Sequence, residues 1–446
     1  MPNARSSAIT RTKSAAPGQR QRTSPGRTPK ERLAEARSLA CAIDLDVVDE
    51  HIIALPVLRP ATLFGTGKVE EIRSHIKGAD ATLVIVDHAL TPIQQRNLER
   101  AWAAKVIDRT GLILEIFGRR ARTREGRLQV ELAHLIFQRS RLVRSWTHLE
   151  RQRGGFGFLG GPGETQIETD RRLLQGRIHK LREELDKVVR TRALHRKGRS
   201  LLPYPVVALV GYTNAGKSTL FNHLTKAGVI AKDQLFATLD PTMRERVLQS
   251  GRRVILSDTV GFVSELPTML VAAFRATLEE VIEAELIIHV RDISHPESEA
   301  QRADVEQVLR DLGVPTEGPD SRLHEVWNKI DLLSDDERNE LPARMARCSN
   351  KPVSLSALTG EGCKELLEAI DAWVSTNDVE ISLTVPVGAG KLTHWLHEHT
   401  TVLTTQADDT GQMVYTFRID AQKLGRLDGH LKSFNVTYEN DSPLNP

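Results

Sequence analysis

The stretch Pro205-Val-Val-Ala-Leu-Val-Gly-Tyr-Thr-Asn-Ala-Gly-Lys-Ser218 decides the fold of this 446-residue chain. It runs from a continuous apolar strand into the pattern Gly-x-x-x-x-Gly-Lys-Ser and then into the start of a helix, which is the setting of a phosphate-binding loop. The glycines let backbone N–H groups face a β-phosphate, and the helix N-terminus adds the positive end of its dipole. Lys217 is expected to bridge the β- and γ-phosphates, and the Ser218 hydroxyl to bind Mg²⁺.

A second apolar strand, residues 253–257, ends at Asp258-Thr-Val-Gly261. The Asp258 carboxylate can hold the water shell of Mg²⁺, and the Gly261 N–H can contact the γ-phosphate. The alternative is a loop aspartate that only caps a helix. Phe262 follows at the position where Ras-like enzymes carry the glutamine that orients the attacking water. The sequence therefore identifies no catalytic residue, and we predict slow intrinsic hydrolysis, at about 10⁻⁴–10⁻² s⁻¹.

The motif Asn328-Lys-Ile-Asp331 follows a third strand, residues 323–327, and predicts which base is bound. A carboxylate at Asp331 can accept the N1–H and the 2-amino hydrogens of guanine, whereas adenine offers no such edge. Asn328 and Lys329 are expected to hold the loop and cover the base, and Ser356-Ala-Leu358 to supply an N–H for guanine O6. In this order, the four patterns predict binding of GTP and GDP with Mg²⁺.

A switch threonine is expected between the first two patterns, with its hydroxyl on Mg²⁺ and its N–H on the γ-phosphate. Thr238 is the first choice and Thr242 the second, and a plain loop threonine is the alternative. The predicted Mg²⁺ ligands are Ser218 and Thr238, with Asp258 acting through water. The predicted nucleotide-binding set is Gly211, Tyr212, Thr213, Asn214, Ala215, Gly216, Lys217, Ser218, Thr219, Phe236, Ala237, Thr238, Leu239, Asp240, Asp258, Thr259, Val260, Gly261, Asn328, Lys329, Ile330, Asp331, Ser356, Ala357 and Leu358.

The net charge of +3 hides a segregation of charge along the chain. Residues 118–199 carry 21 basic and 9 acidic side chains, whereas residues 200–446 carry 23 basic and 36 acidic ones, so only the middle segment favours a polyanionic partner. Aromatic residues make up 4% of the chain, which favours phosphate contacts over base stacking. A solvated helix face is the alternative. The predicted RNA-binding residues are Arg119, Arg120, Arg122, Arg124, Arg127, Arg151 and Arg153.

The expected fold class is α/β, and the composition divides the chain into segments. Residues 1–30 are expected to form a disordered basic tail, with a mitochondrial transit peptide as the alternative. The remaining segments are a small α/β domain at 31–117, a helical hairpin or coiled-coil linker with a glycine-rich loop at 118–200, a P-loop GTPase domain at 203–375 and a small α+β domain at 378–446. Within the GTPase domain, His289 lies in an apolar run and is expected to be a core histidine rather than a catalytic one.

The three cysteines form no disulfide or metal pattern, and no apolar run is long enough to span a bilayer. We therefore expect a reduced, cytoplasmic protein without a membrane span, and a monomer.

Five further stretches make the chain resemble the HflX-type GTPases of the Obg–HflX group, over about residues 50–375. They are Asp108-Arg-Thr-Gly111, Ala121-Arg-Thr123, Leu128-Gln-Val-Glu-Leu132, Arg151-Gln-Arg-Gly-Gly155 and Gly161-Pro-Gly-Glu-Thr-Gln166. The resemblance implies an N-terminal α/β domain, a helical linker, a GTPase domain and a small C-terminal domain. It also implies binding to the large (50S) ribosomal subunit and its rRNA, hydrolysis stimulated by the ribosome and, as in several members, separation of ribosomal subunits under stress.

Two departures from the family pattern affect the expected RNA contacts. The chain has Gly65-Thr-Gly-Lys68 where the family shows a stretch like Gly-Lys-Gly-Lys, and it has Gly160-Gly161 where the family often has an arginine. Two other functions stay open on the sequence: an RNA-binding scaffold whose nucleotide site is only structural, and an ATP-dependent RNA remodeller with a second nucleotide site in the N-terminal region.

Overall fold

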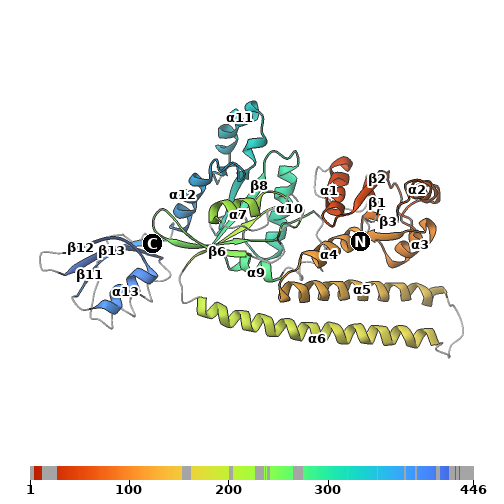
Figure 1. The fold of residues 1–446 in the computed structure, drawn as a ribbon, viewed down its shortest axis with the longest axis horizontal. Coiled ribbons are helices and arrows are strands. Elements are labelled where there is room, and N and C mark those ends of the chain that lie inside the picture. Colours follow the sequence, from red (N-terminus) through yellow and green to blue (C-terminus); the bar gives the residue numbers. More distant parts are fainter. Residues whose placement is uncertain are drawn as a thin grey trace.

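A computed structural model of the protein describes residues 5–12, 28–152, 162–199, 204–226, 236, 238, 242–264, 275–318, 320–348, 350–375, 378–386, 389–407, 412–420, 427 and 431. An N-terminal α/β domain, a long helical hairpin, a central α/β domain and a small C-terminal domain follow one another along the chain (Figure 1). This is the expected fold class.

The N-terminal domain is built on a parallel sheet with the strand order β2-β1-β3-β4. The strand β3 (Leu83–Asp87) is buried at every position, which agrees with the four apolar residues that precede Asp87. The other strands are β1 (Arg5–Thr12), β2 (Asp46–Ala54) and β4 (Lys105–Asp108), and the helices are α1 (Pro29–Cys41), α2 (Thr66–Gly78), α3 (Pro92–Trp102) and α4 (Arg109–Arg120).

The strand β1 corrects the prediction of a disordered tail at residues 1–30 for the stretch Arg5–Thr12. It lies between β2 and β3 and pairs with both in parallel, so that Ile9 is opposite His51 on one side and Val86 on the other. The stretch Arg5–Thr12 has little local strand signal, because it is short and mostly polar. Its partners are strands far along the chain, and β-structure depends on such neighbours more than on intrinsic preference.

Helix α4 was not expected as a separate element, and the predicted boundary at residues 117/118 falls inside it. Its first turn is fixed by Asp108, whose side chain accepts a hydrogen bond from the Gly111 N–H at 2.8 Å. This is an ordinary N-cap, in which a carboxylate satisfies a free backbone donor. The cap places Arg109 at the start of the helix, next to the end of β4.

The helices α5 (Arg124–Gln152) and α6 (Pro162–Arg199) form the expected helical hairpin (Figure 1). They are joined across their contact face by hydrogen bonds such as Arg139 Nη1 to Gln175 Oε1, at 2.8 Å. Val130 and Ala133 of α5 belong to the same apolar core as the α4 side chains. The hairpin is therefore anchored to the N-terminal domain through α4.

The central domain has the six-stranded sheet order β10-β9-β8-β5-β7-β6, in which only the edge strand β6 (Thr242–Val247) is antiparallel to its neighbour. The remaining strands are β5 (Val206–Val210), β7 (Arg253–Asp258), β8 (Leu286–Asp292), β9 (Leu323–Asn328) and β10 (Val353–Ser354). The helices are α7 (Lys217–Thr225), α9 (Arg275–Glu283), α10 (Ser298–Asp311), α11 (Asp335–Met345) and α12 (Cys363–Val374). In such a sheet, ligands bind at the carboxyl ends of the parallel strands.

The C-terminal domain is an antiparallel sheet of order β11-β13-β12 with helix α13 (Gly390–His399). Its strands are β11 (Asp378–Val385), β12 (Thr401–Ala407) and β13 (Met413–Asp420). Within the residues that the structure describes, no helix combines the length and the apolar composition that crossing a membrane requires.

Candidate nucleotide-binding site

The phosphate loop needs its two glycines because neighbouring groups approach its backbone closely. A Cβ on Gly211 would lie 2.2 Å from the Val290 carbonyl oxygen, and a Cβ on Gly216 would lie 2.2 Å from Asn328 Nδ2. Gly216 also has a φ of +91°, which favours glycine. The loop thus lies against the ends of two neighbouring strands, and Lys217 opens helix α7 directly behind it.

Lys217 is a buried cation at the centre of this loop. Its side chain is 6% exposed, and Nζ donates a hydrogen bond to the Tyr212 carbonyl oxygen at 2.7 Å. Burial lowers the pKa of Lys217 to about 8, although the nearby Asp258 carboxylate opposes that shift. A bound phosphate would place a further negative charge beside this buried ammonium group and so stabilise its charged form.

Ser218, Thr238 and Asp258 bring three oxygen atoms together at the expected metal position. The Asp258 Oδ2 atom lies 2.7 Å from Ser218 Oγ and 2.8 Å from Thr238 Oγ1, and the two hydroxyl oxygens are 2.9 Å apart. Adjacent ligands of an octahedral Mg²⁺ ion, with bonds of about 2.1 Å, are separated by about 3.0 Å.

The second oxygen of Asp258 adds an independent reason to expect a cation there. Asp258 Oδ1 is buried and has no hydrogen-bond partner, and burial raises the pKa of this carboxyl group. A divalent cation would compensate an anion that is otherwise costly to bury. The oxygen donors present therefore fit Mg²⁺.

The structure brings Thr238, rather than Thr242, to the other oxygen donors. Thr242 is the first residue of β6 and lies opposite Asp258 in the antiparallel ladder, so it belongs to the sheet. Phe236 packs into the apolar core two residues before Thr238. The remaining predicted residues of this stretch, Ala237, Leu239 and Asp240, lie outside the described residues.

Asn328 connects the base-recognition motif to two other parts of the site. Its Nδ2 donates a hydrogen bond to the Ala215 carbonyl oxygen at 2.8 Å, and its Oδ1 accepts one from the Ala357 N–H at 2.9 Å. Lys329 has a φ of +65°, and its ammonium group lies 2.7 Å from Asp292 Oδ2. The side chain of Asn328 thereby fixes the phosphate loop and the loop after β10 relative to each other.

Asp331 has a carboxylate oxygen that is ready to accept hydrogen bonds. Oδ1 is buried and has no hydrogen-bond partner, and the residue lines an open polar pocket together with Arg338 and Thr359. Guanine presents two N–H donors on one edge, which would satisfy such an oxygen. Of the neighbouring loop, Ser356 is buried and Leu358 is exposed.

The segment after Asp258 is attached to the phosphate loop through its backbone. The Phe262 N–H donates to the Gly211 carbonyl oxygen at 3.1 Å, and the Thr213 N–H donates to the Phe262 carbonyl oxygen at 2.7 Å. A Cβ on Gly261 would lie 2.9 Å from Thr213 Cα, so a side chain there would collide with the loop. These contacts hold the Gly261 backbone at the edge of the phosphate loop.

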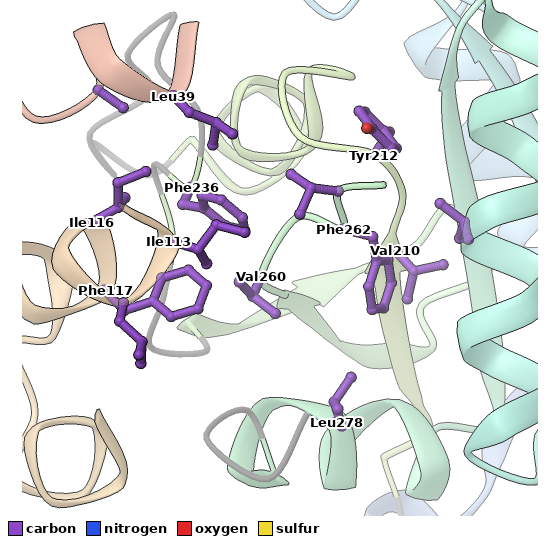
Figure 2. Close-up of a cluster of buried hydrophobic side chains, with 14 of the residues drawn as sticks. Leu39, Ile113, Ile116, Phe117, Val210, Tyr212, Phe236, Val260, Phe262 and Leu278 are labelled. Carbon is purple, nitrogen blue, oxygen red and sulfur yellow. The ribbon is translucent and has the colours of Figure 1, made fainter. Parts of the chain in front are cut away.

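The Phe262 side chain lies in an apolar cluster that the N-terminal and central domains share (Figure 2). Ile113 and Phe117 of α4 lie against Phe236 of the central domain, and the rings of Phe117 and Phe236 meet edge to face with their centres 4.8 Å apart. Phe262 lies farther inside the central domain, beside Val210 (Figure 2). Phe262 is 2% exposed and offers no polar atom to a water molecule.

A buried polar network crosses the same boundary, and its centre is Arg109. Arg109 Nη1 lies 2.6 Å from Asp87 Oδ1, while Nη2 donates to Ser264 Oγ at 2.9 Å and to the Ser264 carbonyl oxygen at 3.0 Å. Nη2 also lies 3.1 Å from Glu35 Oε1, and the Tyr212 hydroxyl donates to the same oxygen at 2.6 Å. Burial lowers the pKa of the Arg109 guanidinium, but Glu35 and Asp87 more than offset this effect, so the pKa is raised.

Reasoning from the sequence did not find this network. It treated Arg109 as part of a family pattern and Tyr212 as a phosphate-loop residue, and it did not mention Glu35. The one available signal was an arginine between two apolar runs, at Ile107-Asp-Arg109-Thr-Gly-Leu112, because a buried arginine needs carboxylate partners.

The predicted RNA-binding arginines divide into two groups. Arg119, Arg120 and Arg127 donate hydrogen bonds to carbonyl oxygens of their own domain region, at 2.6, 3.1 and 3.4 Å. Arg122 and Arg124 are exposed at the start of α5. The side chain of Arg151 and all of Arg153 lie outside the described residues.

His289 is a core residue, as expected. It is 1% exposed, and burial lowers its pKa to about 3, so the imidazole is neutral at physiological pH.

Four comparisons with known families cover most of the chain. Residues 30–118 match the family described as GTP-binding GTPase N-terminal, and residues 120–199 match the GTP-binding GTPase middle region. Residues 206–329 match the 50S ribosome-binding GTPase family, and residues 342–442 match the HflX C-terminal domain.

Individual proteins are similar over nearly the whole length. The GTPase HflX of Magnetococcus marinus is 50% identical over 405 residues, 91% of each chain. The GTPase HflX of Escherichia coli is 46% identical over 369 residues, 81% of this chain and 83% of that protein. A solved structure of a GTP-binding protein from the archaeon Sulfolobus solfataricus, in complex with GDP, is similar over 83% of this chain and 99% of its own, with 22% identity and a TM-score of 0.43.

Proposed function

The chain belongs to the HflX family of GTPases, and from this premise we propose that it binds the large (50S) ribosomal subunit in the cytoplasm when GTP occupies its central domain. The protein is a GTPase that binds GTP and GDP. The proposal extends this activity to a ribosomal partner, to rRNA contacts of the hairpin region, and to separation of the subunits under stress.

The proposed reaction assigns a task to each group of the site. Lys217 holds the β- and γ-phosphates, Asp331 selects guanine, and Gly261 directs its N–H to the γ-phosphate. Mg²⁺, held by Ser218 and Thr238 and through water by Asp258, would neutralise the charge that develops on the phosphate oxygens. Since Phe262 is buried and apolar, nothing at that position orients the attacking water, and slow intrinsic turnover follows.

The observation that carries the ribosomal proposal is the continuity of one apolar core. Val130 of α5, Phe117 of α4 and Phe262 beside the nucleotide site all belong to it. A partner bound to the hairpin therefore contacts a helix, α5, that packs on α4. Helix α4 in turn contacts Phe236, which lies two residues before Thr238. The exposed arginines at the start of α5, in a segment with a large excess of positive charge, suit the phosphates of rRNA.

Sedimentation with isolated 50S subunits tests the proposal. We expect co-sedimentation with GTP or a non-hydrolysable GTP analogue, weaker binding with GDP, and a steep loss of binding as salt is raised, because phosphate contacts release counterions. Replacing both Arg122 and Arg124 by Gln should weaken binding and reduce the salt dependence. Arg177→Gln is the matched control, because Arg177 pairs with Glu131 inside the hairpin, at 2.7 Å.

Two results would contradict this function. Binding to 50S subunits that is equally strong with GTP, with GDP and without nucleotide would instead support an RNA-binding scaffold with a structural nucleotide site. GTP hydrolysis whose rate does not change when 50S subunits are added would contradict stimulation by the ribosome.

A further inference from the structure

The network around Arg109 crosses from the N-terminal domain to the central domain at Glu35, which receives hydrogen bonds from both sides. Two carboxylates, Glu35 and Asp87, face the Arg109 guanidinium, and all three groups are largely shielded from water. Arg32 is a second cation of the network, with Nη2 at 3.4 Å from Asp87 Oδ2. A buried carboxylate is costly unless donors surround it. Glu35 obtains two of its donors from the central domain: the Tyr212 hydroxyl at 2.6 Å and the Ser264 hydroxyl at 2.9 Å.

These two donors belong to two neighbouring parts of the nucleotide site, the phosphate loop and the segment after Gly261. Tyr212 is the second residue of the phosphate loop, and Ser264 follows Gly261 by three residues. They are also joined to each other, because the Ser264 N–H donates to the Tyr212 hydroxyl at 2.8 Å. Ser264 thus lies three residues from the Gly261 N–H, on a segment that is hydrogen-bonded to the phosphate loop through the Phe262 backbone.

The network exists together with a GTP-type arrangement of the site. The hydroxyl oxygens of Ser218 and Thr238 are 2.9 Å apart, a spacing that suits two ligands of one Mg²⁺ ion, and such a switch threonine is in place when the γ-phosphate is present. The docked N-terminal domain and the assembled switch are therefore seen in one and the same conformation.

We propose that Arg109 and Glu35 are positioning residues of the GTPase, which hold the segment from Gly261 to Ser264 in the arrangement that receives the γ-phosphate. By linkage, a ligand that favours this arrangement must also strengthen the docking of the N-terminal domain. GTP therefore tightens the contact between the two domains, and GDP does not. The proposal rests on GTP binding by the central domain and is independent of the ribosomal partner.

Nucleotide affinities of full-length variants test the proposal in the absence of ribosomes. Glu35→Gln weakens the hydrogen bonds from Tyr212 and Ser264, and Ser264→Ala removes the hydroxyl while every charge stays in place. For both variants we expect the preference for a non-hydrolysable GTP analogue over GDP to fall by at least about fivefold, the lower end of typical coupling between sites. The affinity for GDP should stay within about twofold of that of the unchanged protein, because the network acts through the γ-phosphate side of the site.

The matched control is Arg37→Gln. Arg37 lies on α1, as Glu35 does, but its side chain is exposed and forms an ion pair with Glu50 of the N-terminal domain, at 3.0 Å. Its replacement should leave both affinities unchanged. An effect as large as that of Ser264→Ala would overturn the proposal, because it would show that the N-terminal domain acts through its stability alone.

Amide hydrogen exchange supplies the reciprocal measurement. In the unchanged protein, the GTP analogue should protect the backbone of α1 and α4 more than GDP does, and this difference should disappear in Glu35→Gln. Three results would each overturn the proposal. The first is an equal loss of GTP and GDP affinity in the variants, and the second is no change in either affinity. The third is that the effects of Glu35→Gln and Tyr212→Phe are additive in a double-mutant cycle. If the unchanged protein did not bind GTP, the proposed function would fail. If instead the variants kept the preference of the unchanged protein for the GTP analogue over GDP, only the positioning role of Arg109 and Glu35 would be excluded.

Discussion

The side-chain oxygen of Asn328 accepts a hydrogen bond from the Ala357 N–H at 2.9 Å. This contact joins two motifs that are separate in the sequence and are both predicted to bind guanine. The amide nitrogen of the same side chain donates to the phosphate loop, so one buried residue fixes three loops.

Asn328→Ala should therefore weaken nucleotide binding and destabilise the fold together. It leaves the Ala357 N–H and the Ala215 carbonyl oxygen buried without partners, and each such group costs about 1–3 kcal/mol. Thermal unfolding and GDP titration measure the two effects. Asn97→Ala is the control, because Asn97 donates to the Ala61 carbonyl oxygen at the exposed surface of the N-terminal domain, and it should leave GDP affinity unchanged.

Asp331→Asn should change the base that is bound. The amide presents a donor where guanine also presents a donor, so GTP affinity should fall by about 10–100-fold, the worth of hydrogen bonds to a charged group, while xanthosine triphosphate binds better. Competition between the two nucleotides measures this change. Asp336→Asn, in the exposed first turn of α11, serves as the control. Unchanged GTP affinity in Asp331→Asn would show that another group recognises the base.

Much of this site could be predicted from the sequence because its parts are local. The phosphate loop, the Asp258 stretch and the Asn328 motif each lie directly after an apolar strand, and parallel strands bring their carboxyl ends to one edge. Strand order, rather than any single residue, brings Ser218 and Asp258 together.

The features that sequence reasoning missed depend on contacts between distant segments. Strand β1 has a mostly polar sequence and is recognisable only through its neighbours β2 and β3. The Arg109 network joins residues up to 229 positions apart, as between Ser264 and Glu35, and no local pattern records such a pair. Three predicted RNA-binding arginines also donate to carbonyl oxygens of the protein, contacts that a charge count does not show.

Nucleotide binding should depend on pH through Lys217. Its pKa in the free protein is about 8, and the ammonium form binds phosphate, so above pH 8 binding must take up a proton and GDP affinity should fall by up to about tenfold per pH unit. Calorimetry at pH 7, 8 and 9, in buffers of different ionisation enthalpy, measures both the affinity and the proton uptake. Lys217→Arg keeps its charge over this range and should remove the proton uptake, even if its affinity is lower.

The same group should affect stability in the opposite direction. The folded-state pKa of Lys217 lies below its ordinary value of 10.5, so the cost of burying the charge is fully present below pH 8. It is relieved as pH rises from about 8 toward 10.5. The contribution of Lys217 to the free energy of unfolding of the nucleotide-free protein should therefore rise over this range, relative to Lys217→Arg measured in parallel. A constant difference between the two proteins would contradict the lowered pKa.

Phe262 should contribute to packing rather than to chemistry. Phe262→Leu keeps the position apolar, so the intrinsic hydrolysis rate should stay within about threefold of that of the unchanged protein, at about 10⁻⁴–10⁻² s⁻¹. Phe262→Ala leaves a cavity in the buried apolar core and should lower the free energy of unfolding by about 3–5 kcal/mol. Single-turnover hydrolysis and denaturant unfolding separate these effects. A large loss of hydrolysis in Phe262→Leu, with stability unchanged, would show that the ring itself acts at the γ-phosphate.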